Sequence, residues 1–114
     1  MSKRKKFHLI CIAFDRKGKV LSEGHNQYKS HPLQKFFSIK AGESELKHCI
    51  HAELSAILRA GDKQIDSLFV QRFASDGTYA LAKPCKSCQA AIKAYGIRLV
   101  RYTNTTGVES YEVK

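Results

Sequence analysis

The chain has 114 residues, 43% of them hydrophobic and 26% charged, and a formal net charge of +10. This length allows a single compact domain, which we expect to span residues 1–114 with residues 1–6 as a basic tail, and no apolar run approaches the roughly 18 residues that suggest a membrane span. Leaving out the four basic residues 3–6 still gives +6, which favours anionic partners such as nucleotides, nucleic acid or phosphate, although a general solubility charge would look the same.

The chain opens with a predicted β-hairpin. Phe7–Phe14 is apolar apart from His8 and indicates a buried strand. The polar residues 15–19 form a predicted turn, in which Gly18 can take a positive φ. Val20–Gly24 then indicates the return strand.

A long loop and a helix follow in the prediction. Residues 26–47 are polar and aromatic, with a proline, a glycine and no clean period, and we expect a long functional loop there. Tyr28, Phe36 and Phe37 in this loop could stack on a base or pack as part of a lid, and for Phe36 and Phe37 we expect packing. The apolar spacing in Ile50–Ala60 predicts a helix that ends at Gly61.

The second half of the chain is predicted to contain one helix and several short strands. The helix is opened by Pro84 and closed by Gly96. The predicted strands are Ser67–Phe73 and Thr78–Ala82, which could also be one bent strand, followed by Ile97–Tyr102 and Val108–Val113. The element order is β-β-α-β-α-β-β.

Two short motifs contain the residue types of a metal site, His51-Ala52-Glu53 and Pro84-Cys85-Lys86-Ser87-Cys88. His51, Cys85 and Cys88 supply three zinc ligands. A catalytic zinc has three protein ligands and an open position for water, whereas a structural zinc usually has four. Glu53 remains free to move protons to and from that water.

Each motif precedes a predicted helix, and this context supports a shared site. Unpaired N–H groups and a positive partial charge at a helix N-terminus stabilise thiolates. Cys85 and Cys88 are three residues apart and share one side of the first turn. We therefore expect two helix ends to face one zinc ion.

Two other interpretations of the motifs stay open. A structural zinc site could take His48 or Cys49 as its fourth ligand, and a redox C-x-x-C is a second possibility that leaves His51 and Glu53 unexplained. Cys11 lies in an apolar run and is expected to be a buried small side chain. This cysteine usage fits a reducing compartment, and we expect a cytoplasmic protein.

The H-x-E and P-C-x-x-C motifs in this order resemble those of the cytidine deaminase superfamily, over about residues 7–113. The resemblance implies an α/β, three-layer-type fold: a five-stranded mixed sheet with two zinc-binding helices on one face. The short turn at residues 103–107 suggests that the last two strands form an antiparallel hairpin, which resembles the free-cytidine branch of the family; the deoxycytidylate and tRNA-adenosine branches have parallel strands there. The resemblance also implies Zn²⁺ as cofactor and Glu53 as the catalytic proton-transfer residue.

The resemblance extends to substrate binding. Gly24-His25-Asn26 looks like the family's G-x-N motif, which implies that Asn26 contacts the base or sugar, and the N–H of Ala52 would contact the base carbonyl. Free-cytidine deaminases have a ribose-binding glutamate where this chain has Tyr28. We therefore expect a hydrolytic deaminase that acts on the cytosine ring of a nucleotide such as dCMP.

Two alternatives to this function remain. One is a deaminase of cytosine or adenine in single-stranded DNA or RNA, which would explain the charge and the aromatic loop. The other is a nucleic-acid-binding module with a structural zinc, in which Glu53 would have no chemical role.

The sequence also predicts a homo-oligomer. Phe7–Phe14 is apolar on both faces, so both sheet faces need cover. The two zinc helices would cover one face, and the helix that usually precedes the first strand in the family is missing here. An uncovered apolar face commonly marks an interface, and a second subunit is the simplest cover.

Overall fold

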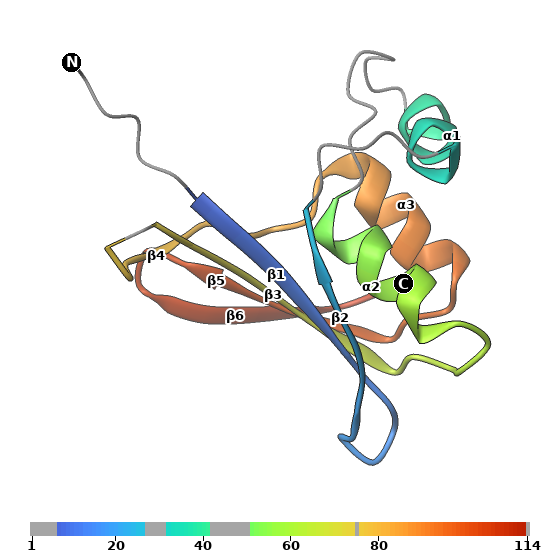
Figure 1. Ribbon diagram of the computed structural model, residues 1–114, viewed down its shortest axis with the longest axis horizontal. Helices are drawn as coiled ribbons and strands as arrows, with labels where there is room; N and C mark the ends of the chain where they lie inside the picture. The colour runs from blue at the N-terminus through green and yellow to red at the C-terminus, as the bar shows by residue number, and fades with distance from the viewer. Residues whose placement is uncertain (1–6, 27–31, 42–50, 75, 114) are drawn as a thin grey trace.

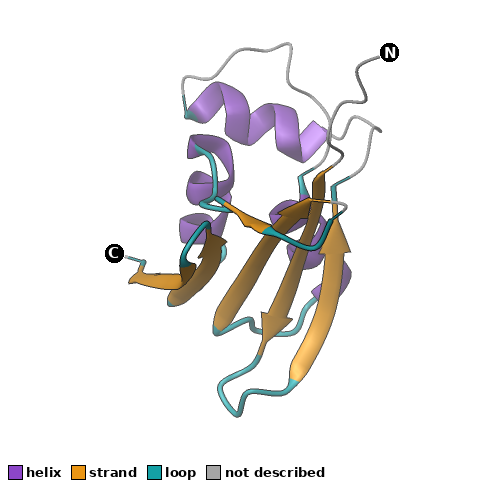
Figure 2. Ribbon diagram, turned by 90° about the vertical axis from the view of Figure 1, so that its left-hand side faces the viewer, coloured by secondary structure: helices purple, strands orange, loops and turns teal. Residues whose placement is uncertain are grey.

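A mixed β-sheet with all described helices on one side forms the frame of the protein (Figure 1 and Figure 2). The computed structural model describes residues 7–26, 32–41, 51–74 and 76–113. The strands run in the order β2-β1-β3-β5-β6, and β4 pairs with the C-terminal end of β3. Their bounds are β1 Phe7–Phe14, β2 Val20–His25, β3 Ser67–Ala74, β4 Tyr79–Ala80, β5 Leu99–Asn104 and β6 Gly107–Glu112.

The predicted fold class is confirmed, with one small strand added. β1 pairs antiparallel with β2 and β3, and β3 pairs parallel with β5. The antiparallel hairpin of β5 and β6 is present as predicted. The five main strands are those expected from the sequence, and β4 is a separate two-residue strand that follows a turn.

Three helices lie on the same side of the sheet. α2 (Ala52–Ala60) packs on β1, β2 and β3 and also contacts α3 (Lys86–Ala94). Both helices end where glycines were expected to stop them, at Gly61 with φ 66° and just before Gly96 with φ 73°. The two predicted helices therefore form and cover one sheet face, as expected.

The additional helix α1 (Pro32–Lys40) corrects the prediction of a loop over residues 26–47. Pro32 is the first helical residue. Proline is favourable at this position because the backbone N–H that it lacks would have no acceptor within the helix. Leu33 and Phe37 are four residues apart and lie on one side of α1, which packs on α3. Phe37 is buried near Tyr95, with 6.3 Å between the ring centroids.

The main core fills the space between the sheet and its helices. Register places Cys11 of β1 opposite Val70 of β3, and Val70 in turn beside Tyr102 of β5. These side chains meet the apolar side of α2 and α3. The most deeply buried large side chains in this layer are Leu54, Leu68, Ile92, Ile97 and Val100.

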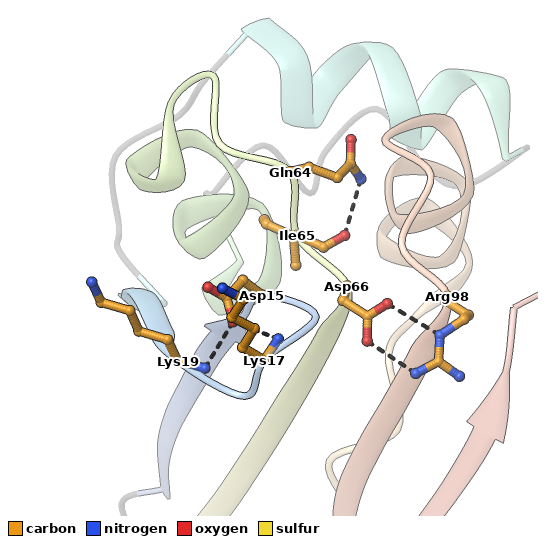
Figure 3. Close-up of polar contacts among 7 residues, drawn as sticks. All are labelled: Asp15, Lys17, Lys19, Gln64, Ile65, Asp66 and Arg98. Atoms are coloured by element: carbon orange, nitrogen blue, oxygen red, sulfur yellow. Dashed lines mark hydrogen bonds and ion pairs between the residues drawn. The ribbon is translucent and has the colours of Figure 1, made fainter.

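Polar contacts tie the strands together at the end where β3 and β5 begin (Figure 3). The Asp66 carboxylate accepts hydrogen bonds from Arg98 Nε at 3.1 Å and Nη2 at 2.9 Å. The backbone N–H of Asp66 donates to the carbonyl of Phe14. Nearby, the Asp15 carboxylate accepts from the N–H groups of Lys17 and Lys19 and stabilises the β1–β2 turn.

None of the helices in the described ranges is long and apolar enough to cross a membrane.

Candidate metal centre

His51 and Cys85 are the N-cap residues of the two central helices. Both have extended backbones, with φ −82° and ψ 159° at His51 and φ −69° and ψ 172° at Cys85, and neither side chain caps its own helix. Their carbonyls instead accept the first helical hydrogen bonds, from the N–H of Ser55 at 3.0 Å and of Gln89 at 2.8 Å. Both side chains therefore extend from the helix ends instead of capping them.

The predicted ligands His51, Cys85 and Cys88 come together. Their ligand atoms all lie within 4.8 Å of one another, and His51 Nδ1 is 3.2 Å from Cys88 Sγ and 3.4 Å from Cys85 Sγ. One imidazole nitrogen and two sulfur atoms form a donor set that suits zinc. His48 and Cys49, the possible fourth ligands of a structural site, lie outside the described residues.

The two thiols of the site differ in acidity. The hydrogen bond with Cys88 lowers the pKa of Cys85 to about 3, helped by contacts with His51 and Ser87. The same bond from Cys85, together with burial, raises the pKa of Cys88. Ser87 Oγ lies 3.1 Å from Cys85 Sγ. A thiolate at a helix N-terminus is the form of cysteine that binds a metal cation.

Glu53 lies beside this donor set without belonging to it. It is the second residue of α2 and only 5% exposed. Burial raises the pKa of its carboxyl above the usual range, while the nearby His51 and a hydrogen bond with Cys88 oppose that rise. A buried carboxyl group with a raised pKa next to a metal centre is suited to taking up and releasing protons.

Gly24 allows β2 to approach the first turn of α2. A Cβ atom at this position would overlap the backbone of Ala52 and Ala56. Ser22 Oγ also donates to the Ala56 carbonyl at 2.6 Å. The C-terminal half of β2 therefore lies against the first turn of α2, the helix that begins directly after His51.

The two predicted substrate-binding residues, Ala52 and Asn26, differ in their exposure to solvent. Ala52 is fully buried as the first residue of α2, where the geometry of the helix leaves its N–H without an intrahelical acceptor. Asn26 is exposed and borders a hollow of about 350 Å³. That hollow is lined by His8, Leu9, Ile10, His25, Asn26 and Phe73.

The aromatic residues expected in the long loop separate into buried and exposed ones. Phe37 packs in the core, whereas Phe36 is 55% exposed, with Lys40 Nζ 6.0 Å from its ring centroid. Tyr28 lies outside the described residues. The expectation that these two rings pack is confirmed for Phe37 and is wrong for Phe36, which is accessible on α1.

Sequence reasoning missed two residues that shape the site. Gly24 enters the sequence prediction only as part of a motif, although a glycine inside a strand often marks a close backbone approach. Ser87 is fully buried beside Cys85, and a small hydroxyl residue between two cysteines carries no distinctive signal by itself.

The comparison with protein families agrees with this geometry. Residues 1–104 match the family model described as the cytidine and deoxycytidylate deaminase zinc-binding region. No curated protein matches the chain significantly.

Proposed function

Because the chain belongs to the cytidine and deoxycytidylate deaminase family, we propose that it is a zinc-dependent deaminase acting on the cytosine ring of a nucleotide such as dCMP. The reaction replaces the ring amino group with a carbonyl and releases ammonia. The observation that supports this most strongly is the buried Glu53 beside three converging zinc ligands. A purely structural site would not need a fourth, non-coordinating acid at that place.

The residues of the site divide the chemistry between them. His51, Cys85 and Cys88 would hold the zinc ion, which would lower the pKa of a water molecule bound to it. Glu53 takes a proton from the attacking water and delivers it to the ring nitrogen next to the carbon that bears the amino group. It then transfers the second proton to the departing amine, so that one water is consumed and one ammonia leaves.

Substrate binding is assigned to residues around the two helix ends. The N–H of Ala52 would donate to the base carbonyl, and the amide of Asn26 would contact the base or sugar. Lys83 and Lys86, both exposed, flank Cys85 in the chain. Their positive charges can pair with a substrate phosphate, which supports a nucleotide over a free nucleoside.

A polynucleotide is the second candidate substrate. Phe36 is an exposed aromatic ring with Lys40 above it, on a helix that packs against α3. An aromatic platform with adjacent cations is suited to stacking a base of single-stranded DNA or RNA. Such a substrate would bind with a steep dependence on salt concentration.

Mass spectrometry of a substrate panel tests this function. The protein is incubated with cytosine and adenine nucleosides, their monophosphates and single-stranded oligonucleotides. Loss of the amine with gain of oxygen names the substrate. We expect higher kcat/KM for a cytosine monophosphate than for cytidine or deoxycytidine. Equal values for the nucleosides and their phosphates would contradict the assignment of a nucleotide.

The variant Glu53→Gln tests the assigned proton transfer. It should keep its fold and its zinc and lose at least about a hundredfold in turnover, the usual scale for a positioned acid–base group. Asp62→Asn, the same change at an exposed residue after α2, is the matched control and should retain full activity. Unimpaired ammonia release by Glu53→Gln would refute the role of Glu53. Zinc binding by the wild type without turnover of any panel member would favour a binding module with a structural zinc.

We also propose a homo-oligomeric, cytoplasmic protein of nucleotide metabolism. The oligomer is supported by β1, which is apolar on both faces. The location is supported by Cys11, Cys85 and Cys88, which are all free thiols and fit a reducing compartment.

A further inference from the structure

The sheet face turned away from α2 and α3, here called the outer face, is rich in apolar side chains. Register sets Ile12 of β1 beside Phe69 of β3, and Phe69 beside Arg101 of β5, so these residues share that face. The half-buried apolar residues on the outer face of β1, β3 and β5 are Ile10, Ile12, Phe14, Phe69, Phe73 and Leu99. None of them belongs to the core cluster found among the described residues.

No helix of the described ranges covers this face. α2 contacts the sheet from the other side, and α1 packs on α3 instead of crossing to the outer face. Val108 of β6 and Tyr79 of β4 also lie on the outer face by register and are 54% and 52% exposed. A continuous apolar surface of this kind on a sheet marks an interaction site.

Arg101 lies among the aromatic rings of this face. Its guanidinium carbon is 5.5 Å from the ring centroid of Phe14 and 5.3 Å from that of Phe69. Its Nε is buried and has no hydrogen-bond partner in the part of the chain that the structure describes. A buried N–H without an acceptor is costly, so an acceptor supplied by a binding partner would stabilise this arrangement.

The charge of the outer face indicates which partner fits. Among the described strand residues, its charged side chains are Arg101, Glu23 and Glu112, with a net charge of −1 when histidines are neutral. The whole chain carries +10, so the cations lie elsewhere. A polyanion such as nucleic acid would find little attraction on this face.

A second copy of the chain meets both requirements. It presents the same apolar surface, and it brings carboxylates, Glu23 and Glu112, that can accept from Arg101. A two-fold dimer joins the same patch on both subunits, so one face must supply both halves of each charged pair. We propose that the outer face is the interface of a homodimer in which Arg101 pairs with a glutamate of the other subunit.

The mass of the full chain in solution tests the proposal, through light scattering and sedimentation equilibrium over a wide concentration range. The wild type should show twice the monomer mass of 12.9 kDa. Ile12→Glu places a charge in the middle of the face, and Ser110→Arg adds bulk at an exposed position next to Arg101. Each should weaken dimerisation at least about tenfold, the scale of a central interface residue.

Matched controls separate this interface from general effects. Ile39→Glu makes the same chemical change at a residue of α1 that is 50% exposed, and it should leave the dimer intact. Circular dichroism checks the fold of each variant. If Ile12→Glu fails to fold, Ser110→Arg decides, because it removes no contact of the core.

A charge reversal tests the proposed pair. Arg101→Glu should weaken the dimer. Adding Glu112→Arg, or Glu23→Arg, to the same chain should restore it and so identify which glutamate pairs with Arg101. Failure of both double variants to restore the dimer would refute the pairing.

A monomeric wild type would overturn the proposed interface, and so would a dimer that persists in both Ile12→Glu and Ser110→Arg. A third contrary result is binding of a labelled single-stranded oligonucleotide that becomes stronger in Ser110→Arg and is lost in Ile12→Glu. The last would assign the face to nucleic acid. These measurements do not involve turnover, so their outcome is independent of the proposed deaminase substrate.

Discussion

Replacing Gly24 with alanine should destabilise the protein and loosen its metal centre together. The added methyl group would overlap backbone atoms of Ala52 and Ala56, which cannot rotate away as a flexible side chain can. Overpacking of this kind costs about 1–3 kcal/mol. Because the atoms met are backbone atoms, the cost at this site belongs in the upper half of that range, about 2–3 kcal/mol. The lower entropy of the unfolded alanine chain offsets about 0.4–1 kcal/mol of it, which leaves a net loss of about 1–2.5 kcal/mol.

This loss of unfolding free energy corresponds to a decrease in the melting temperature Tm that calorimetry can measure. An unfolding entropy of about 2.1 cal/mol/K per residue over 114 residues gives about 0.24 kcal/mol/K. The expected decrease in Tm is therefore about 4–10 °C. Because α2 must move away from β2, the ligand His51 at its N-terminus moves as well, and zinc affinity should fall by about tenfold or more.

Gly18→Ala is the control for the loss of a glycine. Gly18 has φ +82°, and a Cβ atom added there would have no neighbour within 4 Å, so alanine at this position is strained without touching α2. It should lower Tm modestly and leave zinc affinity unchanged. A Gly24→Ala protein with the Tm and zinc affinity of the wild type would refute the close approach of β2 and α2 as the feature that positions His51.

Two further predictions concern the ligands and the Asp66–Arg98 pair. Cys85→Ala and Cys88→Ala should each weaken zinc binding more than about 100-fold, since even changes behind a ligand often cost 10–100-fold; metal analysis that finds full zinc occupancy in the double variant would contradict the ligand assignment. Arg98→Ala should lower Tm less than Gly24→Ala does, because the Arg98 side chain is 61% exposed and salt screens its attraction to Asp66. The hydrogen bonds from Arg98 hold the pKa of Asp66 below its ordinary value, so the pair stabilises the protein above the unfolded pKa of about 4. The difference in Tm between wild type and Arg98→Ala should disappear as pH falls through the lowered pKa, and a difference that grows on acidification would contradict this.

The elements that local patterns determine were predictable from the sequence. The apolar period of Ile50–Ala60 and the stop at Gly61 placed α2 nearly where it lies, and Gly18 takes the positive φ expected in the first turn. The three residues of the zinc site were also predicted from the sequence. Cys85 and Cys88 are three residues apart at the start of a helix, and this spacing places both side chains on one side of the first turn.

The features that were missed depend on packing between distant segments. α1 has no clear apolar period in the sequence, and its apolar side packs on α3, a segment about 50 residues further along the chain. The importance of Gly24 arises from the approach of α2, about 30 residues further along the chain. The unpaired Nε of Arg101 depends on strands that pair across the sheet, at least within the described residues, so no local pattern predicts it.

The position of the zinc ligands has a consequence for the order in which the protein matures. His51 lies 34 and 37 residues from the two cysteines in the chain, and β3 and its neighbours must be in place before α2 and α3 point at one spot. In a zinc finger the metal drives the folding of the chain around it. Here the complete set of ligands exists only when the sheet has brought the two helices together, so tight metal binding requires the folded scaffold and stabilises it in turn.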